Sequence, residues 1–556
     1  MQGSLHSQRA HASGRSVRGL RYAAIVAGIF ALCGTGFGWE SGGRGEIPKA
    51  IRTIMEKPRY AEATWALRVV DVHSGNVIYD LNSQQRLLTG SVRKLYSVSD
   101  LLNRIGPDYR FKTPVYRRGQ VDGSGNLKGD LILVAKGDLT MGGRDQGNDT
   151  LAISNFDHND ANNLKVGVLT APNPLGGLDR LAKQVAASGI TKISGDVIID
   201  DRLFKPFRVP NGNLLVTPII INDNRIDVTV LPTKPGERAK IEWRPKTAAF
   251  TVTKDVMTVA AGQKTDVVLT QNGAHAGLVS GQIAVDYKPP FPGVNTFVRT
   301  FVVDDPDDIN NPTSLQVPTE FARTTFIEAL RRAGVTIDAP LLGVNPAAKL
   351  PPPDCYPTNT KVAELVSTPY AQYSKLILKI SHNLGANLSL MLFGLSHGVN
   401  TMEQALQVER KTLTEEDGLN GEGFYFPTNG SGSPDSEASA ETTVDLLRFM
   451  ERQRDFPEYF RSLPILGVDG SLAEFGANGP ARGKVFAKTG TYVGAAGTIR
   501  AQVLAGYIEA RSGRKLAYAL FVNDAGEALT PDGELTPVLH VIEDEAEIST
   551  IVQQAN

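Results

Sequence analysis

The sequence predicts a mixed α/β (α+β) protein in which an outer domain is interrupted by a nested insertion. Helix-like and strand-like patterns alternate before about residue 115 and again after about residue 355. Between these limits the chain changes to β-branched runs separated by Gly, Asn and Asp. Two segments inside this stretch share one pattern, a helix-like spacing followed by a strand-like run. An α/β unit that itself encloses a β-rich unit fits this order.

Length and composition set the broad class. The chain has 556 residues, of which 41% are hydrophobic and 21% are charged, enough for two to four globular domains. Lys and Arg number 58 and Asp and Glu number 59, so the charge balance argues against a nucleic-acid or polyanion partner. No pattern points to a cofactor.

The N-terminal 40 residues are predicted to be a signal peptide or an N-terminal anchor. Four arginines precede the apolar run Ala23 to Cys33, and small residues follow it. The run is short for a stable membrane span, which favours export over a retained anchor or a buried helix. Cys33 suggests a lipoprotein site only weakly, because Leu32 is large where a small residue is needed.

The first folded elements are a hairpin and a helix. Residues 64–79 contain two strand-like runs around the turn residues His73 to Asn76. Apolar residues at steps of three and four then predict a helix that starts near Ser91 and ends at Gly106. Lys94 lies one turn after Ser91 on the same helix face.

The insertion follows. The two segments that share one pattern, Leu181 to Ile199 and Phe326 to Val344, predict two helix-strand units of one small α/β domain, and residues 205–296 read almost entirely as strand and turn. The predicted ranges are 1–40 for the signal or anchor, 41–115 and 356–556 for the outer domain with its C-terminal tail, 116–204 and 297–355 for the α/β insert, and 205–296 for the nested β-rich domain.

The second half of the outer domain has a clear order. Helical periodicity runs from Tyr370 to Leu395 and carries Ser381-His382-Asn383. Lys488-Thr489-Gly490 lies between strand-like runs, and a hairpin turning at 512–514 follows. Residues 538–552 are predicted to form an amphipathic helix that covers this sheet.

Three short motifs carry the chemistry: Ser-x-x-Lys at 91–94, Ser-x-Asn at 381–383 and Lys-Thr-Gly at 488–490. Chance alone gives about one or two Ser-x-x-Lys patterns in a chain of this length, and a second one does occur at Ser512 to Lys515. Ser-x-Asn also recurs, at 74–76 and 124–126. The order of the motifs, on a helix start, a helix and a strand, therefore favours a serine acyl enzyme.

The residue types explain that choice. A serine hydroxyl needs a base within hydrogen-bond reach, and Lys94 serves if burial and the nearby Lys488 lower its pKa. The N–H groups of Ser91 and Thr491 are expected to receive the oxyanion. Ser381 relays a proton to the leaving amine. Lys488, Thr489 and Thr491 suit a substrate carboxylate.

Cysteine and histidine usage points to no metal site. The eight histidines include no His-x-x-x-His pair, and there is no cysteine cluster. Once the signal is removed only Cys355 remains, so no intrachain disulfide is possible. Its proline-rich surroundings favour an inert residue at a domain boundary over a nucleophile.

From residue 60 to 525 the chain resembles the class C low-molecular-mass penicillin-binding proteins, the D-alanyl-D-alanine carboxypeptidase/endopeptidase family of the penicillin-binding protein 4 type. Ser381 lies 290 residues after Ser91, a separation that suits the family's large two-domain insertion. The matching segments are Ser91–Tyr96, Gly106–Phe111, Gly129–Leu131, Gly137–Thr140, Gly195–Asp200, Asn429–Gly432 and Leu463–Leu472.

The resemblance implies a penicillin-binding/serine β-lactamase-like transpeptidase fold, with a five-stranded sheet between helices, interrupted by the nested insertion. It also implies an enzyme exported to the bacterial periplasm or cell envelope. Its substrates would be peptidoglycan stem peptides, cleaved after D-alanine, and β-lactams would acylate Ser91 as covalent inhibitors. Association with a membrane or the cell wall is compatible with it.

The resemblance carries site residues over one by one. It implies catalytic roles for Ser91, Lys94, Ser381, Asn383 and Lys488. It implies substrate contacts for Thr489, Gly490 and Thr491, and a secondary pocket for a diamino acid side chain lined by Asp200 and Phe204.

Some residues depart from the family pattern. Arg93 replaces the common Met or Gln, His382 stands where Asn or Asp is frequent, and Asp435 follows the Asn429–Gly432 segment where a cation is usual. His382 is expected to point away from the site, since it lies between two functional residues. A β-lactamase or esterase on the same fold, or a catalytically silent penicillin-binding sensor, remain the alternative functions.

Overall fold

The structure is a computed structural model that describes residues 46–164, 166–289, 294, 296–305, 308, 310–530 and 535–556. The predicted signal peptide or anchor at 1–40 lies outside the described residues. Within them, none of the helices combines the length and the apolar character that crossing a membrane requires.

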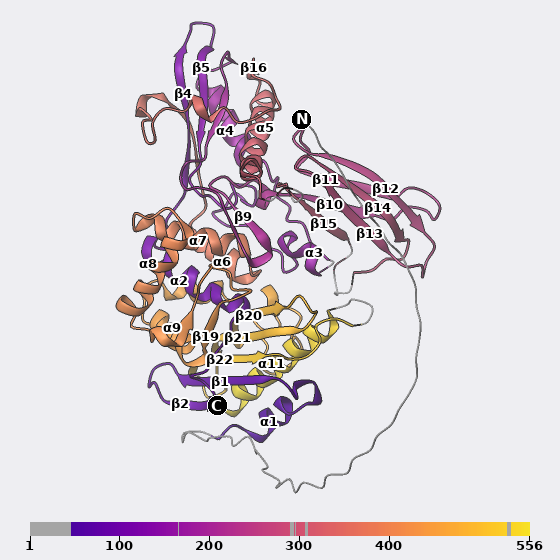
Figure 1. The fold of residues 1–556 in the computed structure, drawn as a ribbon, viewed down its shortest axis with the longest axis vertical. Coiled ribbons are helices and arrows are strands. Elements are labelled where there is room, and N and C mark those ends of the chain that lie inside the picture. Colours follow the sequence, from indigo (N-terminus) through magenta and orange to yellow (C-terminus); the bar gives the residue numbers. More distant parts are fainter. Residues whose placement is uncertain are drawn as a thin grey trace, which may run out of the picture. The chain divides into compact units, whose positions relative to one another are not determined.

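A five-stranded sheet forms the centre of the outer domain, in the order β2-β1-β22-β21-β20 (Figure 1). The predicted hairpin at 64–79 is confirmed as antiparallel β1 and β2, and the hairpin that turns at 512–514 as β21 and β22. The strands are β1 Thr64–Asp71, β2 Val77–Leu81, β20 Val485–Val493, β21 Ile499–Glu509 and β22 Lys515–Asn523. Strands from both ends of the chain thus share one sheet.

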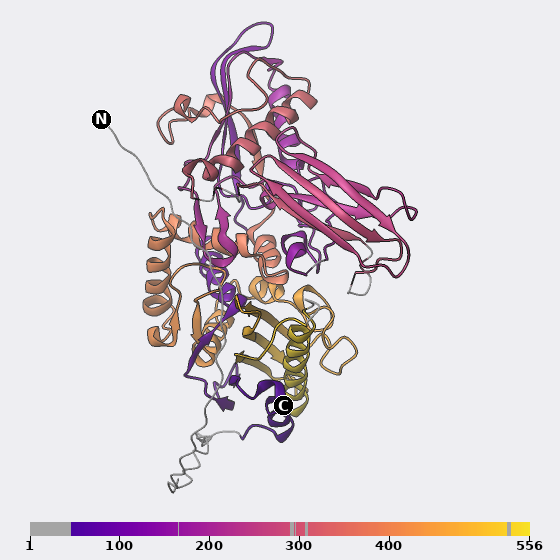
Figure 2. The ribbon, with the colours of Figure 1, turned by 45° about the vertical axis from the view of Figure 1, so that its right-hand side comes forward.

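The two faces of this sheet belong to different cores, because successive side chains of a strand point to opposite sides. On β22, Leu520 packs with α1 Lys49–Met55 and α11 Thr536–Ala555, whereas its neighbour Phe521 packs with the other helices. The turned view shows α11 along one face of the strands (Figure 2). The predicted C-terminal helix over the sheet is therefore confirmed.

The opposite face carries the helices that adjoin the first two motifs, whereas the third motif lies on β20 itself. These helices are α2 Lys94–Ile105, α6 Tyr370–Lys379, α7 Asn383–Ser396, α8 Met402–Lys411, α9 Ala440–Glu451 and α10 Phe456–Ser462. A 3₁₀ turn, η2 Gly90–Arg93, precedes α2, which ends at Gly106 with φ +80° as predicted. A small antiparallel sheet has the order β18-β19-β3. It combines β3 Arg86–Leu88, which precedes η2, with β18 Phe424–Tyr425 and β19 Glu437–Ser439, which follow α8.

The helical run predicted from Tyr370 to Leu395 is two helices, not one. Ser381 adopts φ +59°, which ends α6, and the His382 side chain caps the start of α7 by accepting the N–H of Gly385. A non-glycine residue rarely takes this conformation. The break places the second motif in the joint between two helices.

The insertion contains a six-stranded sheet with the path β16-β6-β5-β4-β17, and β7 pairs with β5. Helices α4 Gly176–Ala187 and α5 Val317–Arg332 confirm the two predicted helix-strand units, and the short α3 Ala161–Leu164 precedes them. Their strands β6 and β16 pair in parallel. The strands are β4 Lys112–Val121, β5 Asn126–Val134, β6 Lys192–Ile193, β7 Val197–Asp200, β16 Thr336–Ile337 and β17 Lys361–Val366.

The nested segment is rich in strands, as predicted. Two three-stranded sheets, β11-β10-β15 and β12-β14-β13, follow a short hairpin of β8 and β9. Their bounds are β8 Phe207–Val209, β9 Leu214–Val216, β10 Arg225–Leu231, β11 Lys240–Arg244, β12 Thr251–Val259, β13 Asp266–Asn272, β14 Ala276–Ala284 and β15 Phe297–Val302.

Two strands lie beyond the limits drawn from the sequence. β15 starts at Phe297 but pairs with β10, and β17 starts at Lys361 but pairs with β4 of the insert sheet. Both partners are far away in the sequence, so local composition carries no sign of the pairing. The domain ranges as such stay a prediction.

Candidate active site

Ser91 lies in η2, directly against strand β20. Gly490 makes this approach possible, because a Cβ atom at that position would lie 2.3 Å from the Thr89 carbonyl oxygen and 3.0 Å from the Ser91 nitrogen. Gly90 has φ +47°, and a Cβ there would lie 2.8 Å from the Thr491 nitrogen. Two glycines thus let the backbone N–H groups of Ser91 and Thr491 come close together.

Lys94 begins α2, and its side chain is fully buried. Its Nζ lies within hydrogen-bond distance of Ser91 Oγ and 3.3 Å from Ser381 Oγ. It also donates to the carbonyl of Ser431 at 3.1 Å. The predicted neighbours Ser91 and Lys94 therefore meet, and a third hydroxyl joins them from residue 381.

Lys488 approaches the same hydroxyl from the sheet. Its Nζ donates to Ser381 Oγ at 2.9 Å and to the carbonyl of Thr489 at 2.6 Å. Its side chain is also fully buried. The four side chains of Ser91, Lys94, Ser381 and Lys488 form one connected group.

Burial governs the protonation of both lysines. Removal from water lowers the pKa of Lys94 well below its ordinary value, and the ammonium of Lys488 lowers it further. Burial lowers the pKa of Lys488 to about 7. The carboxylate of Asp160 opposes both shifts. A lysine whose pKa is lowered by burial is able to act as a base near neutral pH.

The side-chain amide of Asn429 holds the loop at 429–432, which contacts Lys94. Asn429 Oδ1 accepts the backbone N–H groups of Ser431 at 2.9 Å and Gly432 at 2.7 Å. A Cβ at Gly432 would lie 1.9 Å from the Gly90 carbonyl oxygen, so this loop packs tightly on the nucleophile turn. The Ser431 carbonyl is thereby fixed as an acceptor for Lys94.

The remaining motif residues lie at the edges of this group. Thr489 Oγ1 lies 2.7 Å from Ser471 Oγ, and Thr491 Oγ1 donates to Gln502 at 2.7 Å. The Asn383 side-chain oxygen is buried and has no hydrogen-bond partner within the part of the chain that the structure describes. It is a free acceptor at the start of α7.

The insertion also forms hydrogen bonds to loops of this site. Asn155 Oδ1 accepts the N–H of Gly470 at 2.8 Å, next to Ser471. Asn211 donates to Ser431 Oγ at 2.8 Å. Segments of the insert thus contact loops on both sides of the lysine pair.

The sequence that forms this site matches a known enzyme family. A family model described as the D-Ala-D-Ala carboxypeptidase 3 (S13) family matches residues 47–538. The chain belongs to this family. The predicted family, the penicillin-binding fold and the class of serine-type D-Ala-D-Ala carboxypeptidase are confirmed.

Similar proteins agree with the S13 family assignment. A D-alanyl-D-alanine carboxypeptidase of Actinomadura sp. (strain R39) is 26% identical over 504 residues, covering 86% of this chain and 81% of that protein. The carboxypeptidase DacB of Haemophilus influenzae is 23% identical over 475 residues, covering 82% and 84%. The crystal structure of penicillin-binding protein 4 from the same organism aligns with a TM-score of 0.62 at 20% identity, covering 89% of this chain and 98% of that one, which supports the fold.

Two residues that the S13 resemblance placed in a secondary pocket lie outside the connected group. Asp200 accepts bonds from Arg202 Nε at 2.8 Å and from the Tyr356 hydroxyl. Phe204 is 2% exposed and belongs to the hydrophobic core. Neither Asp200 nor Phe204, as the structure describes them, forms a hydrogen bond or an ion pair with the four side chains of the connected group. Their assignment to a diamino acid pocket stays a prediction.

Two departures from the S13 pattern have structural partners. Arg93 is fully buried, forms an ion pair with the buried Glu409 and stacks on Phe426 with 4.0 Å between its Cζ and the ring centroid. Asp435 Oδ1 accepts from Thr428 at 2.8 Å and lines a cavity of about 470 Å³. Tyr492, which follows Thr491, lines the same cavity.

Sequence reasoning missed three contributors to this S13 site. Ser431 supplies the carbonyl for Lys94, Asp160 supplies the carboxylate that opposes the lysine shifts, and Asp223 binds His382 at 2.9 Å. The only signal for Ser431 was its membership of the Asn429–Gly432 segment. Asp160 and Asp223 lie in the insert, where no local pattern connects them with the three motifs.

Proposed function

We propose that this S13 family member is a serine D,D-peptidase that cleaves after D-alanine in peptidoglycan stem peptides through an acyl-enzyme on Ser91. The observation that carries the proposal is the position of Lys94, whose Nζ meets both Ser91 Oγ and Ser381 Oγ in a buried setting. A weak nucleophile beside a base of lowered pKa is the arrangement that acyl transfer needs.

Acylation begins with a neutral Lys94 amine that takes the proton of the Ser91 hydroxyl. Ser91 Oγ then attacks the carbonyl carbon of D-alanine, and the oxyanion is received by the N–H groups of Ser91 and Thr491. The C–N bond breaks as the leaving amine gains the proton from Lys94 through Ser381. A Ser91 ester and a free amine result.

Deacylation reverses these roles. Lys94, neutral again, removes a proton from water, and the hydroxide attacks the ester carbonyl. The C–O bond to Ser91 breaks, and Ser91 Oγ regains a proton from Lys94. The products are the shortened peptide with a free carboxylate and the regenerated enzyme.

Substrate binding is assigned to the edges of the site. The Lys488 ammonium and the hydroxyls of Thr489 and Thr491 suit the terminal carboxylate of the substrate. Asn383 Oδ1, which is buried without a partner among the described residues, would accept an N–H of the substrate backbone. Gly490 contributes by leaving room on the strand.

The cavity of about 470 Å³ extends this binding surface. It is lined by residues next to catalytic segments: Leu88 lies before Ser91, Asp435 after Gly432, and Tyr492 after Thr491. A stem peptide bound along β20 would run into it. Asp435 and Glu437 bring negative charge to this cavity and Arg86 and Arg500 bring positive charge, so its lining offers charges of both signs to a substrate.

We also propose the setting of this activity. Export to the bacterial periplasm or cell envelope follows from the basic and apolar N-terminal residues. β-lactams would be covalent inhibitors, since their ring carbonyl takes the place of the D-alanine carbonyl at Ser91.

Digestion of defined muropeptides with mass analysis tests the proposal. Monomeric pentapeptide muropeptides should lose one terminal D-alanine, and cross-linked dimers should be cleaved at the D-alanyl bridge if endopeptidase activity is also present. Absence of both products with wild-type protein, and their presence with Ser91→Ala, would each contradict the proposal.

A further inference from the structure

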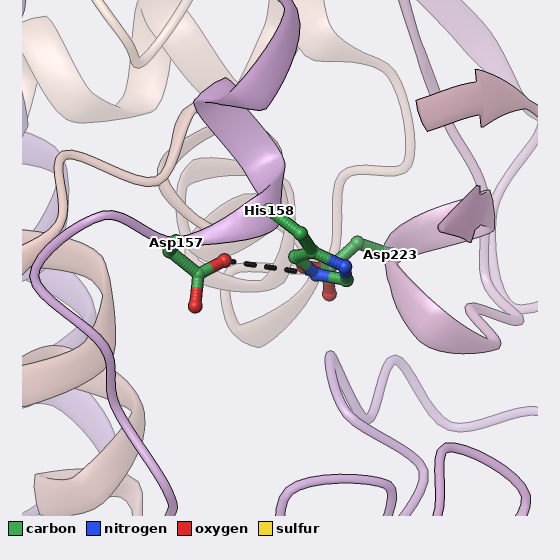
Figure 3. A group of neighbouring side chains, drawn as sticks. All are labelled: Asp157, His158 and Asp223. Atoms are coloured by element: carbon green, nitrogen blue, oxygen red, sulfur yellow. Dashed lines mark hydrogen bonds and ion pairs between the residues drawn. The ribbon is translucent and has the colours of Figure 1, made fainter. Parts of the chain in front are cut away.

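A buried polar cluster joins the insertion to the second motif. His158 lies between Asp157 and Asp223 (Figure 3), with its Nε2 2.7 Å from Asp223 Oδ2 and its Nδ1 2.6 Å from Asp227 Oδ1. Arg144 donates to both Asp157 and Asp223. All of these residues are buried.

The cluster contains two cationic side chains, Arg144 and His158. One nitrogen of Arg144, Nη2, lies 2.8 Å from each of Asp157 Oδ1, His158 Nε2 and Asp223 Oδ2. Burial lowers the pKa of His158, but the surrounding carboxylates outweigh it and raise the pKa to about 10. Asp157, His158 and Asp223 offer possible metal-ligand atoms close together. The Arg144 guanidinium already lies among these atoms.

Among the described residues, Asp223 has one partner outside the insertion. His382 Nε2 lies 2.9 Å from Asp223 Oδ2, and His382 Nδ1 accepts the N–H of Gly385 at 3.0 Å. Because Nδ1 accepts, Nε2 carries the hydrogen and donates it to Asp223. The imidazole is 1% exposed and is held at both nitrogens.

Asp223 is presented by a strained turn. Asn222, Asp223 and Asn224 have φ values of +52°, +54° and +53°, a conformation that non-glycine residues rarely adopt. Side-chain bonds stabilise the turn: Asn222 donates to the Arg225 carbonyl at 2.8 Å and Asn224 to Thr217 Oγ1 at 3.2 Å. Strain that the surroundings maintain in this way is typical of functional positions.

His382 is bonded in sequence to Ser381, whose φ is +59°. The Ser381 hydroxyl is the acceptor shared by Lys94 and Lys488. A shift of His382 would therefore move this hydroxyl relative to the Nζ atoms of both lysines.

We infer that Asp223 of the insertion is a positioning residue for the reaction, which acts through His382 to hold Ser381 between the two lysines. This inference rests on the proposed role of Ser381 in proton transfer. Asp223 touches neither the nucleophile nor the lysines, so its effect is on the rate of acylation and not on the binding of ligand.

The test compares isosteric variants of two buried carboxylates. Asp223→Asn weakens the bond to His382, whereas Asp201→Asn changes a buried carboxylate of the insertion that accepts a hydrogen bond from Thr319 and lies outside the cluster around Asp223. The acylation rate constant and the pre-covalent dissociation constant for benzylpenicillin are measured by rapid quenching and intact-mass analysis. Asp223→Asn should lower the rate constant by about 10- to 100-fold, with less than about 3-fold change in the dissociation constant. Asp201→Asn should change both by less than about 3-fold.

A double-mutant cycle separates positioning from general damage. If Asp223 acts through Ser381, then adding Asp223→Asn to Ser381→Ala should slow acylation by less than about 2-fold further. The same further loss as in the wild-type background, or an equal loss with Asp201→Asn, would overturn the inference. If Ser381→Ala itself acylates at the wild-type rate, the proposed role of Ser381 fails instead.

A second variant addresses the same bond from the catalytic side, in case Asp223→Asn does not fold. His382→Ala should lower the acylation rate constant as Asp223→Asn does, and His382→Gln, which keeps a side-chain N–H, should recover at least about 3-fold of the loss. Equal rates for His382→Ala and the wild type would contradict the inference.

Discussion

Lys488 Nζ lies 2.9 Å from Ser381 Oγ, although 107 residues separate the two in the sequence. The contact joins the strand motif to the joint between α6 and α7. Since Lys94 approaches the same oxygen at 3.3 Å, one hydroxyl links two buried amines. Proton transfer and carboxylate binding therefore share a single small group of atoms.

Lys488→Ala should mainly impair substrates with a free C-terminal carboxylate. Loss of a buried charge-assisted contact is expected to reduce kcat/KM for such a peptide by about 100-fold, with less than about 10-fold loss for an ester that lacks the carboxylate. Steady-state kinetics on both substrates measure this. Lys484→Ala is the control, because Lys484 is half-exposed and pairs with Glu509. Equal losses on peptide and ester would exclude a receptor role for Lys488.

The pH dependence follows from the same lysine. Burial lowers the pKa of Lys488 to about 7, so its ammonium is present below that pH and is lost as the pH rises through it. Values of kcat/KM for carboxylate-bearing peptides should therefore fall above about pH 7. An ester without a carboxylate should lack this descending limb. Profiles from pH 5 to 9 that descend identically for both substrates would contradict the assignment.

Gly490→Ala should displace the nucleophile turn. The new Cβ would lie 2.3 Å from the Thr89 carbonyl oxygen, and backbone cannot yield as a flexible side chain can. We expect penicillin acylation to slow by at least about 100-fold, because the oxyanion donors move apart. Gly494→Ala is the matched control, since its Cβ would meet the flexible Arg500 side chain. Normal acylation in Gly490→Ala would show that the close approach is dispensable.

Arg93→Met should destabilise the fold by about 3–5 kcal/mol, because it leaves Glu409 as a buried charge without its partner. Urea unfolding of the variant measures this loss. The double variant Arg93→Met with Glu409→Leu should recover most of the stability, since it removes both charges. A single variant as stable as the wild type, or a double variant no better than the single one, would argue against the ion pair as the cause.

Local patterns predicted the parts of the site that lie within one element. Ser91 and Lys94 share a helical turn, so their spacing alone predicted their contact. The strand that carries Lys488 and the helix over the sheet were predicted for the same reason. These features depend on residues only a few positions apart.

Features that depend on distant residues were not predictable in this way. The break at Ser381 was missed because apolar spacing continues from Tyr373 through Ile377 to Leu384 and Leu388 across it. Its cause, the capping of α7 by His382, becomes visible only in three dimensions. The pairing of β15 with β10 likewise left no local trace.

The central claim is that Ser91 forms the acyl-enzyme. Peptide mapping by mass spectrometry after reaction with benzylpenicillin tests it most directly. We predict a single adduct, equal in mass to the intact penicillin, on the peptide that contains Ser91, and none in a folded Ser91→Ala variant. An adduct on another residue, or an adduct retained in Ser91→Ala, would contradict the account.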